Sequence, residues 1–240
     1  PGEEGLLDEL ASRGCDPQIK VWNDPDVDWA DAGMVVVRSV SDYAQDRPAF
    51  LEWTRQLHRV QNSKDVLNWN TDKHYLKELA AMGLPTIPTN WLEPSQKLTK
   101  HQIHTRFPAF GEFVVKPAVS SGVRDIGRYT TVDICQRQAA MRQVQGLLSE
   151  GRSVMLQRYV EEIDLHGEIS LVFFNGLVSH AVEKRSALHP ASVTNPKMRE
   201  AVLTADSADS VAWTWGEQIR CVLHNYVRAR LGHDEQFLFN

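Results

Sequence analysis

Residues 112–122 read EFVVKPAVSSG, and this stretch decides the fold that the sequence predicts. Its first part, residues 112–118, is an apolar strand that contains a single ammonium group, Lys116. A charge inside an apolar strand is costly unless an opposite charge meets it, so Lys116 needs either an anionic ligand or a structural carboxylate. The small residues 120–122 can bring backbone N–H groups close to phosphate oxygens. The stretch therefore predicts a strand and a loop that bind phosphate.

Strands and helices alternate through residues 1–66, ahead of this stretch. Residues 3–13 and 47–60 carry apolar side chains at helical spacing, and residues 18–22 predict a short strand. The apolar run at 34–37 predicts a fully buried parallel strand. This order is typical of a small doubly wound α/β domain, whose ligands lie beyond the carboxyl ends of its strands.

A longer series of elements is predicted after residue 66. It comprises a helix at 72–82 capped by Asn70 and Thr71, strands at 112–118 and 128–131, a helix at 133–149, a strand at 153–160, a hairpin at 168–184 turning at Asn175 and Gly176, and a helix at 211–231. The polar stretch at 94–110 is expected to be irregular surface. The last residues, 236–240, are expected to open a further strand.

Composition and charge argue against several classes of protein. The formal net charge of -5 and the pI near 6.0 disfavour a general nucleic-acid binder, which usually carries a strongly basic face. No apolar run approaches the roughly 20 residues of a membrane span. The cysteines Cys15, Cys135 and Cys221 are odd in number and far apart, which fits a reducing cytoplasm. His101 and His104 lack further ligands near them, so they predict no metal site.

Three blocks of sequence resemble the ATP-grasp superfamily in their order and spacing. They are NTDKHYLKEL at 70–79, EFVVKPAVSSG at 112–122 and VMLQRYVEEIDLHGEISLVFF at 154–174. Two further blocks, RSVSDY at 38–43 and VSHAVEK at 178–184, are similar to the ring-closing ligases of D-cycloserine biosynthesis. The chain is thereby identified as a member of this superfamily, similar to glutathione-synthetase-like and D-cycloserine-type ligases. The resemblance implies an α/β protein with an α+β lid, in which the ATP-grasp fold follows an N-terminal doubly wound α/β domain.

The resemblance also implies an ATP site. Its residues are Lys73 and Lys116 at the phosphates, Ser120, Ser121 and Gly122 in the loop over them, Gln157, Arg158, Tyr159 and Val160 at the adenine edge, and Glu168 at the ribose with Asp164 in reserve. Adenine would meet the side chain of Gln157 and backbone groups of the three residues after it. Lysine supplies compact charge to phosphate oxygens, and a carboxylate accepts the hydrogens of a diol.

An acceptor site and a reaction follow from the same resemblance. The acceptor residues implied are Arg38, Ser39, Asp42 and Tyr43, and the catalytic residues implied are Lys116 and Lys184. Arg38 and Lys184 offer a cation to a substrate carboxylate. In the cycloserine-type relatives one molecule carries both the carboxylate and the attacking nitrogen. We therefore expect an ATP-dependent carboxylate–amine ligase that works through an acyl phosphate and closes the ring of D-cycloserine from O-ureido-D-serine.

Cofactors, domains and partners complete these expectations. The cofactors implied are ATP and Mg²⁺, and the magnesium ligands are expected beyond Asn240. The domains expected are a pre-ATP-grasp domain at 1–66, a central and lid part at 67–157 and a C-terminal ATP-grasp part at 158–240. The partners expected are small-molecule carboxylate and amine substrates, in a cytoplasmic role in antibiotic biosynthesis. We expect no nucleic acid and no membrane, and a homodimer is one option.

Two alternatives to this function stay open. The first is a nucleotide-binding scaffold without catalysis, and the second is an amino-acid or peptide ligase of the same fold. An acidic pair of strands after the chain's last residues would favour an enzyme, because metal charge is needed to neutralise the phosphates during transfer.

Overall fold

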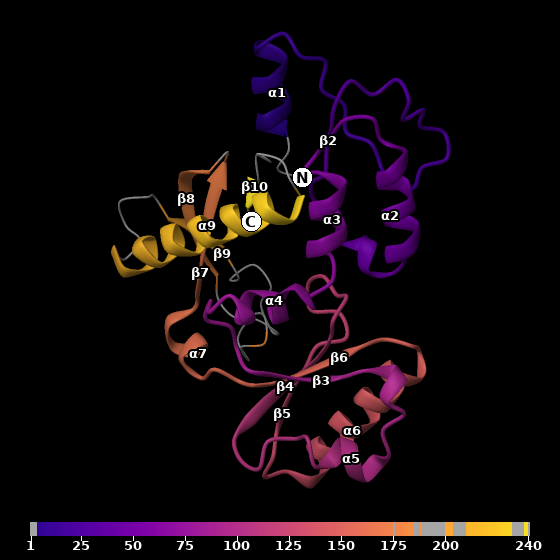
Figure 1. Cartoon of the computed structure of the whole chain (residues 1–240), viewed down its shortest axis with the longest axis vertical. Helices are drawn as coiled ribbons and strands as arrows, with labels where there is room; N and C mark the ends of the chain where they lie inside the picture. The colour runs from indigo at the N-terminus through magenta and orange to yellow at the C-terminus, as the bar shows by residue number, and fades with distance from the viewer. Residues whose placement is uncertain are drawn as a thin grey trace.

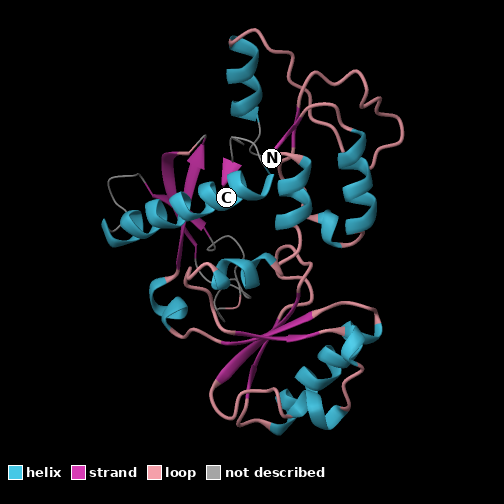
Figure 2. Ribbon diagram, in the orientation of Figure 1, coloured by secondary structure: helices cyan, strands magenta, loops and turns pink. Residues whose placement is uncertain are grey.

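Three sheets organise the chain in the computed structural model, which describes residues 4–174, 176–184, 188, 200–203, 210–231 and 238–239 (Figures 1 and 2). The first sheet pairs two strands near the N-terminus. The second has four strands in the order β3-β6-β4-β5, and the third has four in the order β10-β7-β8-β9. Each sheet draws its strands from its own stretch of chain, so the three sheets follow one another in the sequence.

One parallel βαβ unit forms the core of the N-terminal part. Strands β1 (Val35–Val36) and β2 (Val60–Gln61) pair in parallel, and the helix α2 (Arg47–Gln56) connects them. The side chains buried on this helix and just after it are Phe50, Leu51, Trp53 and Leu57. The predicted helix and its apolar face are therefore confirmed, although the helix ends at Gln56 and Val60 belongs to β2.

Some expectations for this N-terminal part are wrong. No strand forms at residues 18–22, and β1 is not fully buried, because Met34 is 55% exposed and Val36 is 47% exposed. The physical reason is the size of the sheet, since two strands of two residues each cannot be covered on both faces. The described residues thus contain a single βαβ unit and not a doubly wound sheet. Helix α1 (Glu4–Ser12) stands as predicted, ahead of Gly14 at φ 82°.

The middle sheet is antiparallel throughout. Its strands are β3 (Thr89–Leu92), β6 (Val154–Arg158), β4 (Glu112–Pro117) and β5 (Gly127–Thr130). Helices α5 (Lys100–His104) and α6 (Ile134–Ser149) cover one face of it (Figure 1). Two short 3₁₀ helices, Asp42–Ala44 and Pro94–Gln96, lie in the loops ahead of α2 and α5.

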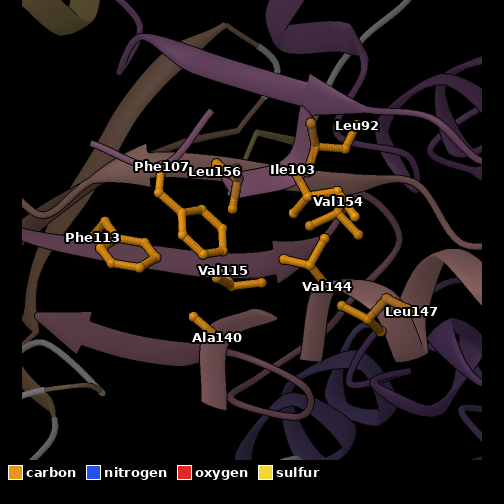
Figure 3. Close-up of a cluster of buried hydrophobic side chains, with 10 residues drawn as sticks. All are labelled: Leu92, Ile103, Phe107, Phe113, Val115, Ala140, Val144, Leu147, Val154 and Leu156. Atoms are coloured by element: carbon orange, nitrogen blue, oxygen red, sulfur yellow. The ribbon is translucent and has the colours of Figure 1, made fainter. Parts of the chain in front are cut away.

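A cluster of buried apolar side chains fills the space between this sheet and its helices (Figure 3). Its members are Leu92, Ile103, Phe107, Phe113, Val115, Ala140, Val144, Leu147, Val154 and Leu156. Successive side chains of a strand point to opposite faces. Because Phe113 and Val115 point into this core, Lys116 points to the other face of the sheet. Burial of the apolar set fixes the register and thereby the direction of the lysine.

The expectation of an irregular surface at 94–110 is wrong. Helix α5 begins with a capping box, in which Thr99 and Gln102 each accept the backbone N–H of the other. The helix and the turn after it carry Ile103 and Phe107 into the core, where they are 2% and 7% exposed. So few apolar side chains stand in this polar stretch that their periodicity gives no clear helical signal.

The helix expected to begin after Thr71 starts later, and Lys73 lies outside it. Helix α3 (Lys64–Asn70) ends just before, and helix α4 (Tyr75–Ala81) begins just after. Thr71 does not cap α4, because its hydroxyl donates to the carbonyl of Leu67 at 2.7 Å. Asn70 is the last residue of α3 and caps nothing after it. Lys73 therefore stands on a short turn between two helices.

The third sheet and a long helix form the C-terminal part. Its strands are β7 (Glu168–Phe174), β8 (Leu177–Lys184), β9 (Glu200–Leu203) and β10 (Leu238–Phe239). Helix α9 (Ser210–Leu231) lies across this sheet (Figure 1), and a Cβ added to Gly216 would come within 2.3 Å of Leu171 Cδ1. The hairpin, the last strand and the covering helix are confirmed, although Asn175 of the hairpin turn lies outside the described residues. A short helix that the sequence did not predict, α7 (Glu162–His166), precedes β7.

Among the described helices, none combines the length and the apolar composition that a membrane span requires.

Candidate functional site

The face of the middle sheet that points away from α5 and α6 carries the polar side chains of the site. Lys116 and Glu112 stand on β4, and Arg128 pairs opposite Val114 on the neighbouring strand. Gln157 also pairs opposite Val114, from β6. Residues directly opposite each other in a sheet share a face, so charged and amide groups gather on this side. We call it the polar face.

Lys73 reaches the small-residue loop that follows β4. Its ammonium group donates to the carbonyl of Ser120 at 2.7 Å and to the Ser120 hydroxyl at 2.8 Å. Its backbone N–H donates to the carbonyl of Ala118 at 3.0 Å. The turn between α3 and α4 is thus fixed against the end of β4, so the structure brings together two of the predicted phosphate-binding elements.

The two predicted phosphate lysines both have lowered pKa values. Burial lowers the pKa of Lys73 to about 8, helped by the positive charge of Lys116 and opposed by Asp72. Burial also lowers the pKa of Lys116, and the carboxylate of Glu168 opposes that change. Desolvation that is not balanced by a close carboxylate favours the neutral amine. The pair therefore forms a positive site whose charge the protein itself stabilises poorly.

The loop after β4 opens into a cleft of about 1030 Å³. Ser120 is 6% exposed, and its hydroxyl also donates to the carbonyl of Pro117, so this residue forms the fixed base of the loop. Ser121 and Gly122 line the cleft, and Gly122 has a φ of 62°, a conformation that favours glycine. The loop thus has a fixed base and an accessible tip beside an open volume.

The backbone at the end of β6 leaves a carbonyl free of the sheet. The N–H of Tyr159 donates to the carbonyl of Glu112 at 2.9 Å, so the polar backbone groups of Arg158 point toward β3. In the β3 register, Thr89 lies opposite Gln157, which places Pro88 opposite Arg158. Proline has no N–H to donate. The ladder therefore leaves the Arg158 carbonyl available to an amino group such as that of adenine.

Arg128 ties the end of β6 to its neighbours. Its guanidinium hydrogen-bonds to Glu112, forms an ion pair with Asp164 at 2.8 Å, and stacks 3.7 Å from the ring centre of Tyr159. Burial opposes the charge of Arg128, but the bonds to Glu112 and Asp164 outweigh it and raise the pKa. The Tyr159 hydroxyl donates to Asp164 as well. Asp164, the reserve candidate for ribose, is therefore already bonded to two protein groups.

The remaining adenine and ribose candidates have differing surroundings. The side chain of Gln157 is buried and donates to the hydroxyl of Thr89 at 2.7 Å, which occupies its amide nitrogen. The side chain of Arg158 lies over the ring of Phe110, and Val160 follows on the loop to α7. Glu168 is exposed at the start of β7 and lies within electrostatic range of Lys116.

The predicted acceptor loop reaches the site at one residue. The Tyr43 hydroxyl donates to the carbonyl of Ser120 at 3.4 Å, which connects the N-terminal part to the loop 120–122. Asp42 instead accepts the indole N–H of Trp22 at 3.0 Å. Ser41, Ala44, Gln45, Arg47 and Pro48 are the residues of this region that line the cleft.

Arg38, Ser39 and Lys184 are not among the residues that line the cleft. Lys184 ends β8 directly opposite Glu168 in the register of the hairpin. It therefore lies on the side of the phosphate lysines, whereas Arg38 and Ser39 lie on the chain just after β1.

Within the described part of the chain, no group of three His, Cys, Asp or Glu side chains could hold a metal ion. His101 and His104 are exposed, and His104 contacts the guanidinium of Arg137. The exposed cysteines Cys15, Cys135 and Cys221 are all unbridged.

Several residues of the site were missed by the sequence analysis. Asp72 and Ser153 line the cleft, and His74 and Glu93 connect them, as described below. Arg128 was missed as well. Nothing in the local sequence marks these residues, because they come from separate elements that meet only in the folded chain.

Comparison with known proteins identifies similar sequences. Residues 1–68 match the family described as the N-terminal domain of D-cycloserine synthetase DcsG. The chain is 35% identical over 190 residues to the cycloserine biosynthesis protein DcsG of Streptomyces lavendulae. That match covers 77% of this chain and 62% of the relative, so the chain spans less than two thirds of that relative's length.

Solved structures are similar as well. The crystal structure of D-cycloserine synthetase DcsG matches with a TM-score of 0.77 and 30% identity, over 98% of this chain and 78% of that one. An ATP-grasp protein with a RimK domain from Sphaerobacter thermophilus matches with a TM-score of 0.56 and 14% identity, over 94% and 95% of the two chains. At that identity the second likeness shows the fold alone. The mixed α/β fold is thus that of the ATP-grasp ligases.

Proposed function

Because this chain belongs to the D-cycloserine synthetase DcsG family of ATP-grasp ligases, we propose that it is an ATP-dependent carboxylate–amine ligase that closes the ring of D-cycloserine. The substrate proposed is O-ureido-D-serine, which carries the carboxylate and the attacking nitrogen in one molecule. ATP and Mg²⁺ are the proposed cofactors.

One observation carries the proposal: Lys73 contacts the small-residue loop and lies within electrostatic range of Lys116, and both lysines have lowered pKa values. A structural lysine would usually have its pKa raised by a close carboxylate. Here burial prevails, so a ligand with negative charge would favour the charged form of both groups. The phosphates of ATP have that charge and fit a loop that can offer backbone N–H groups. The open Arg158 carbonyl adds support, since it suits the adenine amino group.

The residues of the chain would act by position and charge. Lys73 and Lys116 would hold the phosphates, the loop 120–122 would close over them, and Glu168 would accept the ribose hydroxyls. ATP would supply the phosphoryl group that activates the substrate carboxylate. Electrostatic preorganisation and alignment account for most catalysis of this kind, which explains why no conventional acid–base pair is required. Mg²⁺ would supply further positive charge at the phosphates.

The cleft beside the loop is the proposed acceptor site. Its volume of about 1030 Å³ leaves room for a small amino acid beside the loop 120–122. Attack by the nitrogen bonded to oxygen closes a five-membered ring on the activated carboxyl carbon and expels phosphate. The ring product equals the substrate minus one water, while ATP becomes ADP and phosphate. Water must then remove the carbamoyl group as carbon dioxide and ammonia to give D-cycloserine. Arg38, Ser39, Asp42, Tyr43 and Lys184 do not line the cleft, so the contacts proposed between them and this substrate would have to form when the ligands bind.

The test is the product formed from O-ureido-D-serine, ATP and magnesium by the purified protein. Mass spectrometry should find D-cycloserine, or the carbamoyl-bearing ring, in a quantity equal to the ADP released. ADP release that instead requires two separate amino acids, with a dipeptide as the product, would replace ring closure by peptide ligation. ATP binding without ADP release on any substrate would favour the non-catalytic scaffold.

A further inference from the structure

A histidine next to the phosphate lysine lies between two carboxylates. His74 Nδ1 is 2.6 Å from Asp72 Oδ1, and His74 Nε2 is 3.0 Å from Glu93 Oε1. The backbone N–H of His74 also donates to Asp72 at 3.1 Å. The ring stacks on Trp91, with 4.5 Å between ring centres and 26° between planes. Both ring nitrogens and one ring face are therefore engaged.

Glu93 carries this contact into the middle sheet. It follows the end of β3, and its second carboxylate oxygen accepts the hydroxyl hydrogen of Ser153, the residue just before β6. Burial raises the pKa of Glu93, but hydrogen bonds from Ser153 and His74 outweigh burial, so the pKa is lowered. Lys77 of α4 also donates to Glu93, at 3.3 Å, and lies over the Trp91 ring. The carboxylate is thus ionised and bonded from three sides.

The first and last residues of this series of contacts, Asp72 and Ser153, lie at the candidate site. Asp72 and Ser153 both line the cleft, and Lys73 stands between Asp72 and His74 in the sequence. The Lys73 turn is fixed on a second side, because its N–H donates to the carbonyl of Ala118 at the end of β4. The direction of the Lys73 ammonium therefore depends on two anchors, one to β4 and one to β3 and β6.

We propose that the contacts Asp72–His74–Glu93–Ser153 position Lys73 for the phosphates of ATP. His74 is the positioning residue, since it alone of the four contacts both carboxylates. The inference rests on the proposed function, because it assigns Lys73 to phosphate. It extends that function by naming groups that do not themselves contact the phosphates and yet control the affinity for a phosphate-bearing ligand. A purely structural role for the same contacts would affect nucleotide and nucleoside alike.

The experiment compares ATP with adenosine, each titrated by calorimetry in the absence of acceptor substrate. His74→Ala is expected to weaken ATP binding about tenfold, because a displaced ammonium loses charged hydrogen bonds to phosphate, while the adenosine affinity stays unchanged. His74→Gln can still donate to Glu93 and should restore most of the ATP affinity. His74→Asn keeps only the local bond to Asp72 and should not. His101→Ala, at an exposed histidine of α5, serves as the matched control and should bind both ligands normally.

Other results of these titrations would contradict either the inference about His74 or the proposed function. Unchanged ATP affinity in folded His74→Ala would overturn the inference, and so would an equal loss for ATP and adenosine. If His74→Ala does not fold, Glu93→Gln replaces it in the comparison of ATP with adenosine. The amide of this variant can still accept from Ser153 but has no charge for His74, so only ATP binding should weaken. A wild-type protein that binds neither ligand would overturn the proposed function itself, and the inference with it.

Discussion

The two faces of the β3-β6-β4-β5 sheet are built from the same strands but differ in their side chains and in their roles. On β4, Phe113 and Val115 are fully buried under α5 and α6. One residue further along, Lys116 lies on the polar face with a lowered pKa and within range of Glu168. The first face holds the sheet and its helices together, whereas the second gathers charges that the protein only partly balances. A step of one residue therefore separates a side chain of the core from a side chain of the proposed site.

The difference teaches that the helix-covered face determines the position of the polar face. Because side chains alternate, a slip of one residue would bury Lys116 under α6 and expose Phe113. The cost of that slip keeps the lysine on the polar face. Substitutions on the helix-covered face should therefore change the free energy of unfolding, and substitutions on the polar face should change ATP binding.

Lys116→Ala gives the largest expected effect on function. We expect ADP release to fall below detection and ATP binding to weaken, because the ammonium group contacts charge that develops during transfer. The unfolding midpoint should stay unchanged or rise, since a partly desolvated ammonium is removed. Steady-state ADP release and denaturant unfolding measure the two quantities. Lys100→Ala, an exposed lysine on α5, is the control, and full activity of folded Lys116→Ala would contradict the assignment.

Phe113→Ala tests the other face. Removing a fully buried phenylalanine should lower the free energy of unfolding by about 3–5 kcal/mol, through lost burial and the cavity left behind. Denaturant titration followed by circular dichroism measures the change. The folded fraction should still bind ATP with normal affinity. A loss below 1 kcal/mol would mean that this face is not the core that the register implies.

The pH dependence of ATP binding tests the charge of the polar face. Lys73, with a pKa of about 8 in the free protein, is charged below pH 8 and neutral above it. Only the charged form attracts phosphate, so ATP affinity should be constant below pH 8 and fall above it, by up to about tenfold per pH unit for one proton. The lowered pKa of Lys116 adds to the loss.

Calorimetry between pH 7 and pH 10 measures this profile. Tyr43 and Tyr75 should not interfere, because burial raises both pKa values above 10.0. Lys73→Arg is the control, since a guanidinium stays charged throughout the range and should flatten the Lys73 contribution. An affinity that rises with pH would contradict the proposed role of both lysines.

The smallest expected effects separate Asp164 from Glu168. Asp164→Asn should lower the free energy of unfolding by about 1 kcal/mol, because its ion pair with Arg128 is only partly shielded from water, and should leave ATP affinity nearly unchanged. Glu168→Gln should do the reverse, weakening ATP binding by several-fold with little change in the rate at saturating ATP. Paired titrations and unfolding curves distinguish them. If Asp164→Asn weakened ATP binding and Glu168→Gln did not, Asp164 would be the ribose contact.

Patterns within a single element could be read from the sequence, because they depend on near neighbours. The apolar strand around Lys116, the hairpin turn at Gly176 and the amphipathic helix 211–231 all carry their signal locally, and the structure has all three. The resemblance of three blocks likewise gave the ATP-grasp fold. The capping box at Thr99 is equally local, but with so few apolar residues after it the stretch did not indicate a helix.

Contacts between residues of different helices and strands could not be predicted from the sequence. Arg128 and Asp164 lie 36 positions apart in the chain and meet only because β4 pairs with both β5 and β6. His74 and Glu93 meet because α4 packs beside the end of β3. The position of Lys73 on a turn, and not on a helix, depended on α3, whose packing the local pattern did not reveal.

The sequence by itself determined which residues have side chains and backbone suited to a phosphate ligand, and the tertiary structure decided which of them stand together. An apolar strand with one lysine and a small-residue loop have this chemistry in any context, because it follows from side-chain charge and glycine geometry. The lowered pKa of Lys73, which lies on a turn, requires burial and the approach of Lys116 from strand β4. Both are properties of distance and solvent exclusion, which exist only after the chain has folded.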